Sequence, residues 1–125
     1  MLSRMADKPL ILLVEDDPEF GEQMAERVAE LGYAVAGPAA TLEAAETLLA
    51  ERAPDAALLD GVLAGRSSAP FAATLATRGV PFVFVTGDDR IAGLAKELKQ
   101  VVPLLTKPVS EKLLSETLAR LTQKN

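Results

Sequence analysis

Five short apolar runs alternate with segments of helical periodicity along the chain, and this alternation restricts the fold more than any other feature of the sequence. The runs are residues 10–14, 33–36, 56–60, 80–85 and 101–106. Uninterrupted apolar runs of this kind are typical of strands that are covered on both faces. Because a helical pattern follows each run, the sequence predicts repeated βα units, which form a parallel sheet with helices on both faces. The expected fold class is therefore α/β, a doubly wound five-stranded parallel sheet.

Capping residues predict where the helices begin and end. Asp17-Pro18 should start the first helix, and Gly32 should end it. The other expected N-caps are Thr41, Ser67 or Ser68, Asp88 or Asp89, and Ser110. Apolar residues recur at helical spacing in each segment, as Phe20, Met24, Val28 and Leu31 do in the first and Leu113, Leu114, Leu118 and Leu121 in the last.

Glycine, serine and proline predict three irregular places. Gly37-Pro38 should break the second strand. Residues 61–68 contain glycine and serine and should form a loop. Pro103 lies within the last run and favours an edge strand there, because proline has no N–H to donate to a neighbour.

The composition excludes several classes of function. The chain has 13 Lys and Arg against 18 Asp and Glu, and its net charge of -5 argues against direct nucleic-acid binding. It has no cysteine, which excludes disulfides, zinc thiolates and thiol nucleophiles. It has no histidine, so it cannot be a histidine phosphodonor. A bound metal would therefore need oxygen ligands, which favours Mg²⁺, Ca²⁺ or Mn²⁺.

The length of 125 residues suits one domain with one core. We expect residues 1–8 to be a flexible lead-in and residues 9–125 to form a single domain without an output domain. No apolar run approaches the ~18 residues that span a bilayer. Residues 1–8 also lack the apolar core of a signal peptide, so a cytoplasmic protein without membrane contact is expected.

Polar side chains stand at the ends of four of the apolar runs. Glu15 and Asp16 follow the first, Asp60 ends the third, Thr86 follows the fourth and Lys107 follows the last. Ligand crevices of open α/β sheets lie at the carboxyl ends of their strands. The five residues should therefore line one site.

The three acids of this set predict a metal site. Glu15, Asp16 and Asp60 would meet if the first and third strands are neighbours, and carboxylates so close repel one another unless a cation joins them. Mg²⁺ is the natural partner, because it prefers oxygen ligands. Lys107 would pair with Asp60 or with a bound anion, and Thr86 adds a hydroxyl donor. This set suits an aspartate that attacks phosphorus and carries a phosphoryl group.

Four segments resemble, in the same order, the motifs of response-regulator receiver domains: Val14-Glu15-Asp16-Asp17, Leu58-Leu59-Asp60, Val85-Thr86-Gly87 and Thr106-Lys107-Pro108. The resemblance covers nearly the whole chain. It implies a flavodoxin-like sheet with the strand order 2-1-3-4-5.

The resemblance also implies a role for each residue of the site. Asp60 would be the phosphoacceptor, Thr86 would be the switch hydroxyl, and Lys107 would bind a phosphoryl oxygen. The Lys107-Pro108 peptide bond is expected to be cis. The ligands of Mg²⁺ would be Glu15, acting through water or more loosely, together with Asp16, Asp60 and the carbonyl group of Val62.

Two segments depart from the usual pattern of this family. Asp60-Gly61-Val62-Leu63-Ala64 replaces the usual Asp-x-x-Met-Pro turn, and Leu104 stands where an aromatic switch residue is usual. Residues 80–87 are similar to the Pro-Phe-x-Phe-Ala-Thr-Gly segment of single-domain receivers known mainly from alphaproteobacteria, with Val85 in place of alanine.

The implied function is signalling in a two-component system or phosphorelay. A histidine kinase or histidine phosphotransfer protein would donate a phosphoryl group to Asp60, and the chain would then switch a partner-binding surface or pass the group on. The expected surface comprises the fourth helix, fifth strand and fifth helix, around Leu94, Leu104 and Lys112, and it could also form a homodimer. The chain would not be an enzyme beyond its own phosphorylation and dephosphorylation.

Two alternatives remain open from the sequence. A pseudo-receiver would bind its partner regardless of phosphorylation, which the altered loop and Leu104 allow. An aspartate-nucleophile phosphatase would need a general acid two positions after Asp60, where the chain has Val62.

Overall fold

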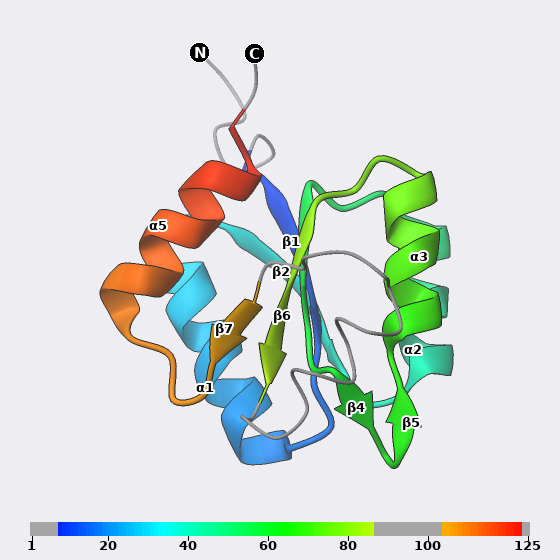
Figure 1. The fold of residues 1–125 in the computed structure, drawn as a ribbon. Coiled ribbons are helices and arrows are strands. Elements are labelled where there is room, and N and C mark those ends of the chain that lie inside the picture. Colours follow the sequence, from blue (N-terminus) through cyan, green and yellow to red (C-terminus); the bar gives the residue numbers. More distant parts are fainter. Residues whose placement is uncertain (1–7, 87–103, 124–125) are drawn as a thin grey trace.

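The described residues of the computed structural model, 8–86 and 104–123, form a central sheet between two pairs of helices (Figure 1). The sheet contains β1 (Leu10–Val14), β2 (Ala34–Ala39), β3 (Ala56–Leu59), β6 (Phe82–Thr86) and β7 (Leu104–Thr106). The helices are α1 (Pro18–Glu30), α2 (Leu42–Glu51), α3 (Ala69–Thr77) and α5 (Glu111–Leu121). Two short strands, β4 (Val62–Leu63) and β5 (Arg66–Ser67), form a separate hairpin.

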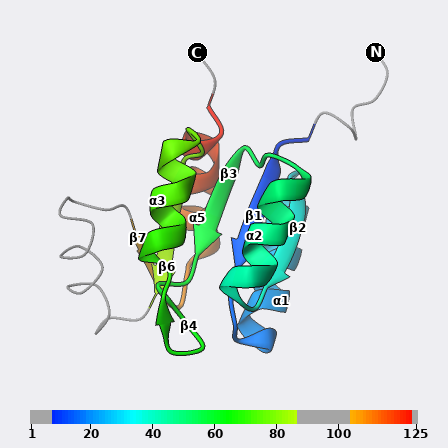
Figure 2. The same cartoon turned by 90° about the vertical axis from the view of Figure 1, so that its right-hand side faces the viewer.

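The five strands of the main sheet are parallel and lie in the order β2-β1-β3-β6-β7. This order confirms the predicted flavodoxin-like topology. Helices α1 and α5 cover one face of the sheet, and α2 and α3 cover the other (Figures 1 and 2). The strand order reverses between β1 and β3, so the carboxyl ends of these two strands mark the place where such sheets bind ligands.

Alternate residues of the central strands contribute to two separate cores. Leu12 and Val14 of β1 pack with residues of α2 and α3, whereas Ile11 and Leu13 pack with residues of α1 and α5. Successive side chains of a strand point to opposite faces, and both faces of this sheet are covered. This double burial explains why the strands appear in the sequence as uninterrupted apolar runs.

Local capping chemistry sets the starts of α1, α2 and α5 as predicted, whereas Ser68 at the start of α3 makes no capping bond. The Asp17 side chain caps α1 by accepting the backbone N–H groups of Glu19 and Phe20, and Pro18 follows in the first turn. Thr41 caps α2 and Ser110 caps α5 in the same way. Gly32 follows α1 with a φ of +103°, a left-handed conformation that glycine adopts without strain.

The prediction that Gly37-Pro38 breaks the second strand is wrong. Strand β2 runs through both residues, with an irregularity in its pairing to β1 between Leu12 and Val14. Pro38 is tolerated because β2 is an edge strand. Gly37 is required there, because its φ is +111° and a Cβ atom would lie 2.4 Å from the carbonyl oxygen of Leu13.

Two further predictions about local structure are also corrected. Residues 61–68 are not a simple loop, because they contain the β4–β5 hairpin. Leu113 does not join the buried face of α5, since it is 43% exposed, whereas Leu114 and Leu118 are fully buried.

Some predictions lie outside the described residues. These are the fourth helix with its cap at Asp88 or Asp89, the surface position of Leu94, the first residues of the fifth strand with Pro103, and most of the lead-in. Within the described ranges, no helix combines the length and the apolar character needed to cross a membrane. The domain boundaries stay a prediction.

Candidate functional site

The carboxyl ends of four parallel strands bring the predicted site residues to one edge of the sheet. Glu15 follows β1, Asp60 follows β3, Thr86 ends β6 and Lys107 follows β7. Backbone hydrogen bonds join neighbouring strand ends. Asp60 N–H donates to Val14 O at 2.9 Å, and Lys107 N–H donates to Thr86 O at 3.1 Å. These strand ends therefore lie along one rim of the sheet.

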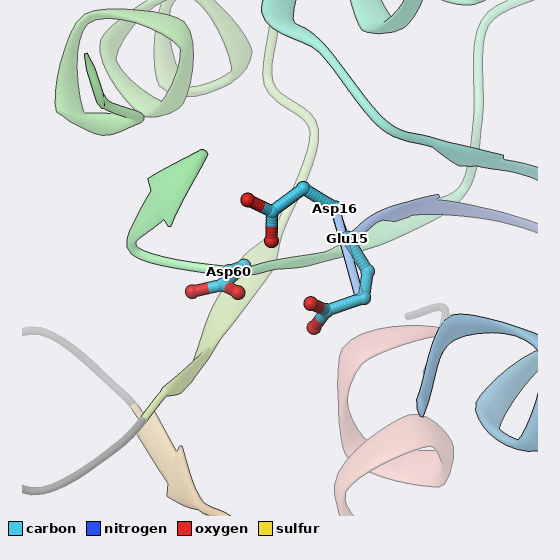
Figure 3. A group of neighbouring side chains, drawn as sticks. All are labelled: Glu15, Asp16 and Asp60. Carbon is cyan, nitrogen blue, oxygen red and sulfur yellow. The ribbon is translucent and has the colours of Figure 1, made fainter. Parts of the chain in front are cut away.

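Three carboxylates gather at this rim, as Figure 3 shows for Glu15, Asp16 and Asp60. Each side chain offers one oxygen such that the three atoms lie within 4.8 Å of one another. Glu15 and Asp60 are 3% and 2% exposed, whereas Asp16 is more exposed. The adjacency of β1 and β3 thus produces the acidic group that the sequence predicted.

Two hydrogen bonds hold Glu15 in place, one at its backbone and one at its side chain. Its N–H donates to Ala39 O of β2 at 2.9 Å, and its Oε2 accepts the N–H of Asp17 at 3.0 Å. Burial raises the pKa of Glu15 from its ordinary 4.5 to about 7, against the opposing effects of the Asp17 N–H and Lys107. The nearby charge of Asp60 contributes to this rise.

Lys107 brings a positive charge to the carboxylates. Its Nζ lies 3.0 Å from Glu15 Oε1 and 3.3 Å from Asp60 Oδ2. Burial acts to lower the pKa of Lys107, but the hydrogen bond to Glu15 and the charges of Asp60 and Glu15 outweigh it and leave that pKa raised. Lys107 is therefore an ammonium at neutral pH, and the Lys107-Pro108 peptide bond is cis as expected.

Thr86 lies at the same rim with a hydroxyl group that has no hydrogen-bond partner in the described part of the chain. The residue is fully buried, and so is its Oγ1 atom. A buried hydroxyl without a partner costs roughly 1–3 kcal/mol. Such a group is available to an oxygen atom that enters the site.

The β4–β5 hairpin follows Asp60 directly and contacts the acidic group at two points. Val62 N–H donates to Asp60 Oδ1 at 3.2 Å, and Ala64 N–H at the turn donates to Asp16 Oδ2 at 2.8 Å. The hairpin therefore joins two carboxylates that belong to different strands.

Ser68 anchors the base of this hairpin. It is fully buried, its Oγ donates to Asp60 O at 2.6 Å, and its N–H donates to Gly61 O at 2.9 Å. Ser68 holds the N-cap position of α3 without making a capping bond, and Ser67 Oγ accepts the Ala69 N–H instead. The anchor fixes the backbone of Asp60 relative to α3.

The hairpin register also determines where the carbonyl group of Val62 faces. Leu63 and Arg66 flank a two-residue turn, and Val62 pairs with Ser67 one position further away. In such hairpins the pair beside the turn is the hydrogen-bonded one, and the next pair turns its N–H and C=O groups outward. Because Val62 N–H faces Asp60, its carbonyl group is expected to face the same carboxylates.

The donor set fits a hard divalent cation. Three carboxylates against the one ammonium of Lys107 leave an excess of negative charge, which a cation bound by oxygen ligands would offset. Glu15, Asp16 and Asp60 could hold such an ion, and Val62 could add a carbonyl oxygen.

Sequence reasoning missed two structural features of the site. The hairpin left one local signal, since Ala64-Gly65 lies between residues that can pair, but a type I′ turn usually carries Asn or Asp at the first position. The second is at Phe20, which packs against the core as its helical spacing predicts, while Lys107 Nζ also lies over its ring, 4.5 Å from the centroid. No pattern in the sequence links these two residues.

A pocket of about 460 Å³ lies between α2, β5 and α3, away from the strand ends. It is lined by residues that include Leu42, Arg66 and Phe71. It contains none of the five predicted site residues. The chemistry therefore belongs to the strand ends rather than to this pocket.

The sequence matches the family model of the response regulator receiver domain over residues 11–119. No curated protein matches the chain. Similar solved structures include the signal receiver domain of a modulated diguanylate cyclase from Desulfovibrio desulfuricans G20, with 29% identity, a TM-score of 0.79, and coverage of 93% of this chain and 94% of that one.

Two further solved structures are similar over most of their length. The PhyR response regulator REC domain from Erythrobacter litoralis is 28% identical with a TM-score of 0.81, covering 94% of this chain and 92% of its own. The non-phosphorylated HemR receiver domain from Leptospira biflexa is 31% identical with a TM-score of 0.75, covering 94% and 97%.

Proposed function

The chain belongs to the response regulator receiver domain family, and from that premise we propose that it accepts a phosphoryl group on Asp60. Its general role is signalling. The proposed donor is a histidine kinase or a histidine phosphotransfer protein. The observation that carries the proposal is the convergence of Glu15, Asp16 and Lys107 around the buried Asp60.

In the proposed reaction, a carboxylate oxygen of Asp60 attacks the phosphorus atom of a phosphohistidine. The new P–O bond forms as the P–N bond breaks, and the imidazole leaves with the bonding electron pair and takes a proton from solvent. Lys107 Nζ, 3.3 Å from Asp60 Oδ2, is close enough to bind an oxygen of the transferred group.

The proposed cofactor is Mg²⁺, held by Glu15, Asp16, Asp60 and the carbonyl group of Val62. When bound, it would offset the charge of the transferring phosphoryl group. The excess negative charge of the three carboxylates supports this assignment. Asp16 keeps one oxygen for the ion while the other accepts the Ala64 N–H.

Thr86 is the proposed switch residue. Its buried hydroxyl has no partner among residues 8–86 and 104–123, and it would donate to a phosphoryl oxygen on Asp60. This new bond would bias the surface around β7 and α5 toward a second arrangement. Leu104, where an aromatic is usual, is half-buried and packs against the core shared with α2 and α3.

The phosphorylated state would then bind an unidentified protein partner, form a homodimer, or pass the phosphoryl group on. We propose no enzymatic activity beyond the chain's own phosphorylation and dephosphorylation. A phosphatase is the weaker alternative, because Val62 lacks the titratable group that a general acid requires.

Labelling with a small phosphodonor tests the proposal. Incubation with acetyl phosphate and Mg²⁺ should give an acid-stable, base-labile phosphoprotein. Chelation of the metal or the substitution Asp60→Asn should abolish the label, while Asp17→Asn, which alters a capping residue outside the acidic group, should keep it. Equal labelling of Asp60→Asn and the unaltered chain would refute the proposal.

A pseudo-receiver is the second candidate, supported by the replacement of the usual aromatic by Leu104. The two candidates differ in whether phosphorylation changes binding. If the chain is a phosphorylation-dependent receiver, a protein partner should bind it more tightly when a phosphoryl mimic occupies the site. Equal binding with and without the mimic would favour the pseudo-receiver.

A further inference from the structure

Lys107 has three close neighbours in the described structure, and one of them is not a carboxylate. Its ammonium group lies 3.0 Å from Glu15 Oε1, 3.3 Å from Asp60 Oδ2 and 4.5 Å from the centroid of the Phe20 ring, over the face of that ring. The negative face of an aromatic ring attracts a cation, more strongly where water is partly excluded. The Lys107 side chain is 26% exposed, so the contact is partly shielded from solvent.

Packing and a hydrogen bond place the Phe20 ring and the segment that carries Lys107 next to each other. Phe20 lies in the first turn of α1, where its N–H donates to the capping carboxylate of Asp17 at 3.2 Å. Its ring is half-buried against the core shared with α5. Further along α1, Arg27 Nη1 donates to Val109 O at 2.9 Å, which joins the helix to the segment that follows Lys107-Pro108. The helix that carries Phe20 is thus joined to the segment after Lys107 by a bond that does not involve the acidic group.

The two carboxylates are the partners that the proposed function would change. A metal ion would take electron pairs of Glu15 and Asp60, and phosphorylation would convert Asp60 into an acyl phosphate. Neither event uses the ring of Phe20. Of these three neighbours of Lys107, the Phe20 ring is the one whose chemistry neither event changes.

We infer that Phe20 is a positioning residue for Lys107, holding the ammonium at the rim through the contact with its ring while the carboxylate partners of Lys107 change. The inference rests on the proposed function for its role in phosphoryl transfer. The contact itself does not, because it is present without a phosphoryl group. Phe20 is not a catalytic residue, since it acts through Lys107.

A substitution series at Phe20 separates this role from simple packing. Phe20→Leu keeps an apolar side chain but removes the π face, whereas Phe20→Tyr and Phe20→Trp keep it. A surface pocket of about 110 Å³, lined in part by Phe20 and Pro108, leaves room for a larger ring. The matched control is Phe82→Leu, because Phe82 is also a half-buried aromatic residue but lies at the opposite end of its strand from Thr86.

The measurement is the rate constant of phosphorylation by acetyl phosphate with saturating Mg²⁺, together with the free energy of unfolding of each variant. Phe20→Leu should slow the reaction by about threefold to thirtyfold, as expected for the loss of one cation–π contact. Phe20→Tyr, Phe20→Trp and Phe82→Leu should stay close to the unaltered rate. In a Lys107→Gln background, Phe20→Leu should have no further effect on the rate.

Three results would overturn the inference: an unaltered rate for Phe20→Leu, equal slowing by the aromatic variants, or the same slowing of the Lys107→Gln chain. The proposed function is judged separately, by whether the unaltered chain is phosphorylated at all. If it is not, the contact is still tested by nuclear magnetic resonance. The ring should shift the Lys107 ε-methylene protons upfield, and this shift should vanish in Phe20→Leu. A shift that persists in that variant contradicts the inference.

Discussion

Glu15 combines two demands that oppose one another. The fold buries its carboxyl group at the end of β1, which favours the neutral form, whereas a metal ligand must be charged. Lys107 and the Asp17 N–H offset part of the cost of burying the charge but leave the pKa of Glu15 at about 7. Protons and a metal ion should therefore compete for this residue near neutral pH.

The raised pKa of Glu15 has a consequence for stability. The pKa of the Glu15 carboxyl group is about 7 in the folded protein against an ordinary 4.5, so the folded state binds this proton more tightly than the unfolded state does. The resulting stabilisation is complete below pH 4.5 and is lost as pH rises through 7. Without metal, the free energy of unfolding should fall across this window by on the order of 3 kcal/mol.

Urea unfolding at a series of pH values, with the metal chelated, measures this effect. Glu15→Gln, which stays neutral, should flatten the fall between pH 4.5 and 7, and the exposed Glu22→Gln should not. If Glu15→Gln keeps the slope of the unaltered chain, the pKa of Glu15 is not raised.

At the scale of single elements, β2 shows why a strong local signal can fail. Gly37-Pro38 has the composition of a turn, yet β2 continues through it because β1 pairs with β2 on both sides of these two residues. The second requirement is glycine itself, since a Cβ atom at position 37 would lie 2.4 Å from Leu13 O.

Two alanine substitutions at glycines of similar φ separate backbone strain from steric clash. Gly32 and Gly37 have φ values of +103° and +111°, but a Cβ atom at Gly32 would have nothing within 4 Å. Gly32→Ala should cost about 1 kcal/mol of unfolding free energy from the left-handed conformation alone. Gly37→Ala should cost about 1–3 kcal/mol more because of the clash. Equal losses in thermal or urea unfolding would show that the contact with Leu13 O is not limiting.

The β4–β5 hairpin carries a local strain that a substitution should relieve. Ala64 has a φ of 48° and Gly65 a φ of 81°, the combination of a type I′ turn. Asparagine adopts this conformation more readily than alanine, so Ala64→Asn should raise the free energy of unfolding by about 1 kcal/mol. The control is Ala40→Asn, also exposed but without a positive φ, which should change stability little. A chain with Ala64→Asn that is no more stable than the unaltered one would contradict this account of the turn.

Local rules were reliable where the chemistry is local. Asp17, Thr41 and Ser110 cap their helices as predicted, because a capping side chain needs only the next three residues. The hairpin is harder to predict because part of its support comes from elsewhere in the chain, through the bond from the Ala64 N–H at the turn to Asp16.

At the scale of the whole molecule, the alternation of apolar runs and helices was enough to predict the class of fold. The family resemblance then implied the strand order β2-β1-β3-β6-β7 that the structure has. This strand order also assembles the site, because the pairing of β1 with β3 brings Glu15 and Asp16 close to Asp60. The contact between Phe20 and Lys107 could not be predicted, since it depends on how α1 sits against the segment after β7.

The central claim is that this rim transfers a phosphoryl group to Asp60 and to no other acid beside it. Mapping the modified residue by mass spectrometry, after borohydride reduction of the acyl phosphate, tests this claim most directly. With acetyl phosphate and Mg²⁺, we expect reduction at Asp60 alone and none when the metal is chelated. A phosphoryl group mapped to Glu15, Asp16 or Asp17, or no modification of the folded protein at all, would contradict the account.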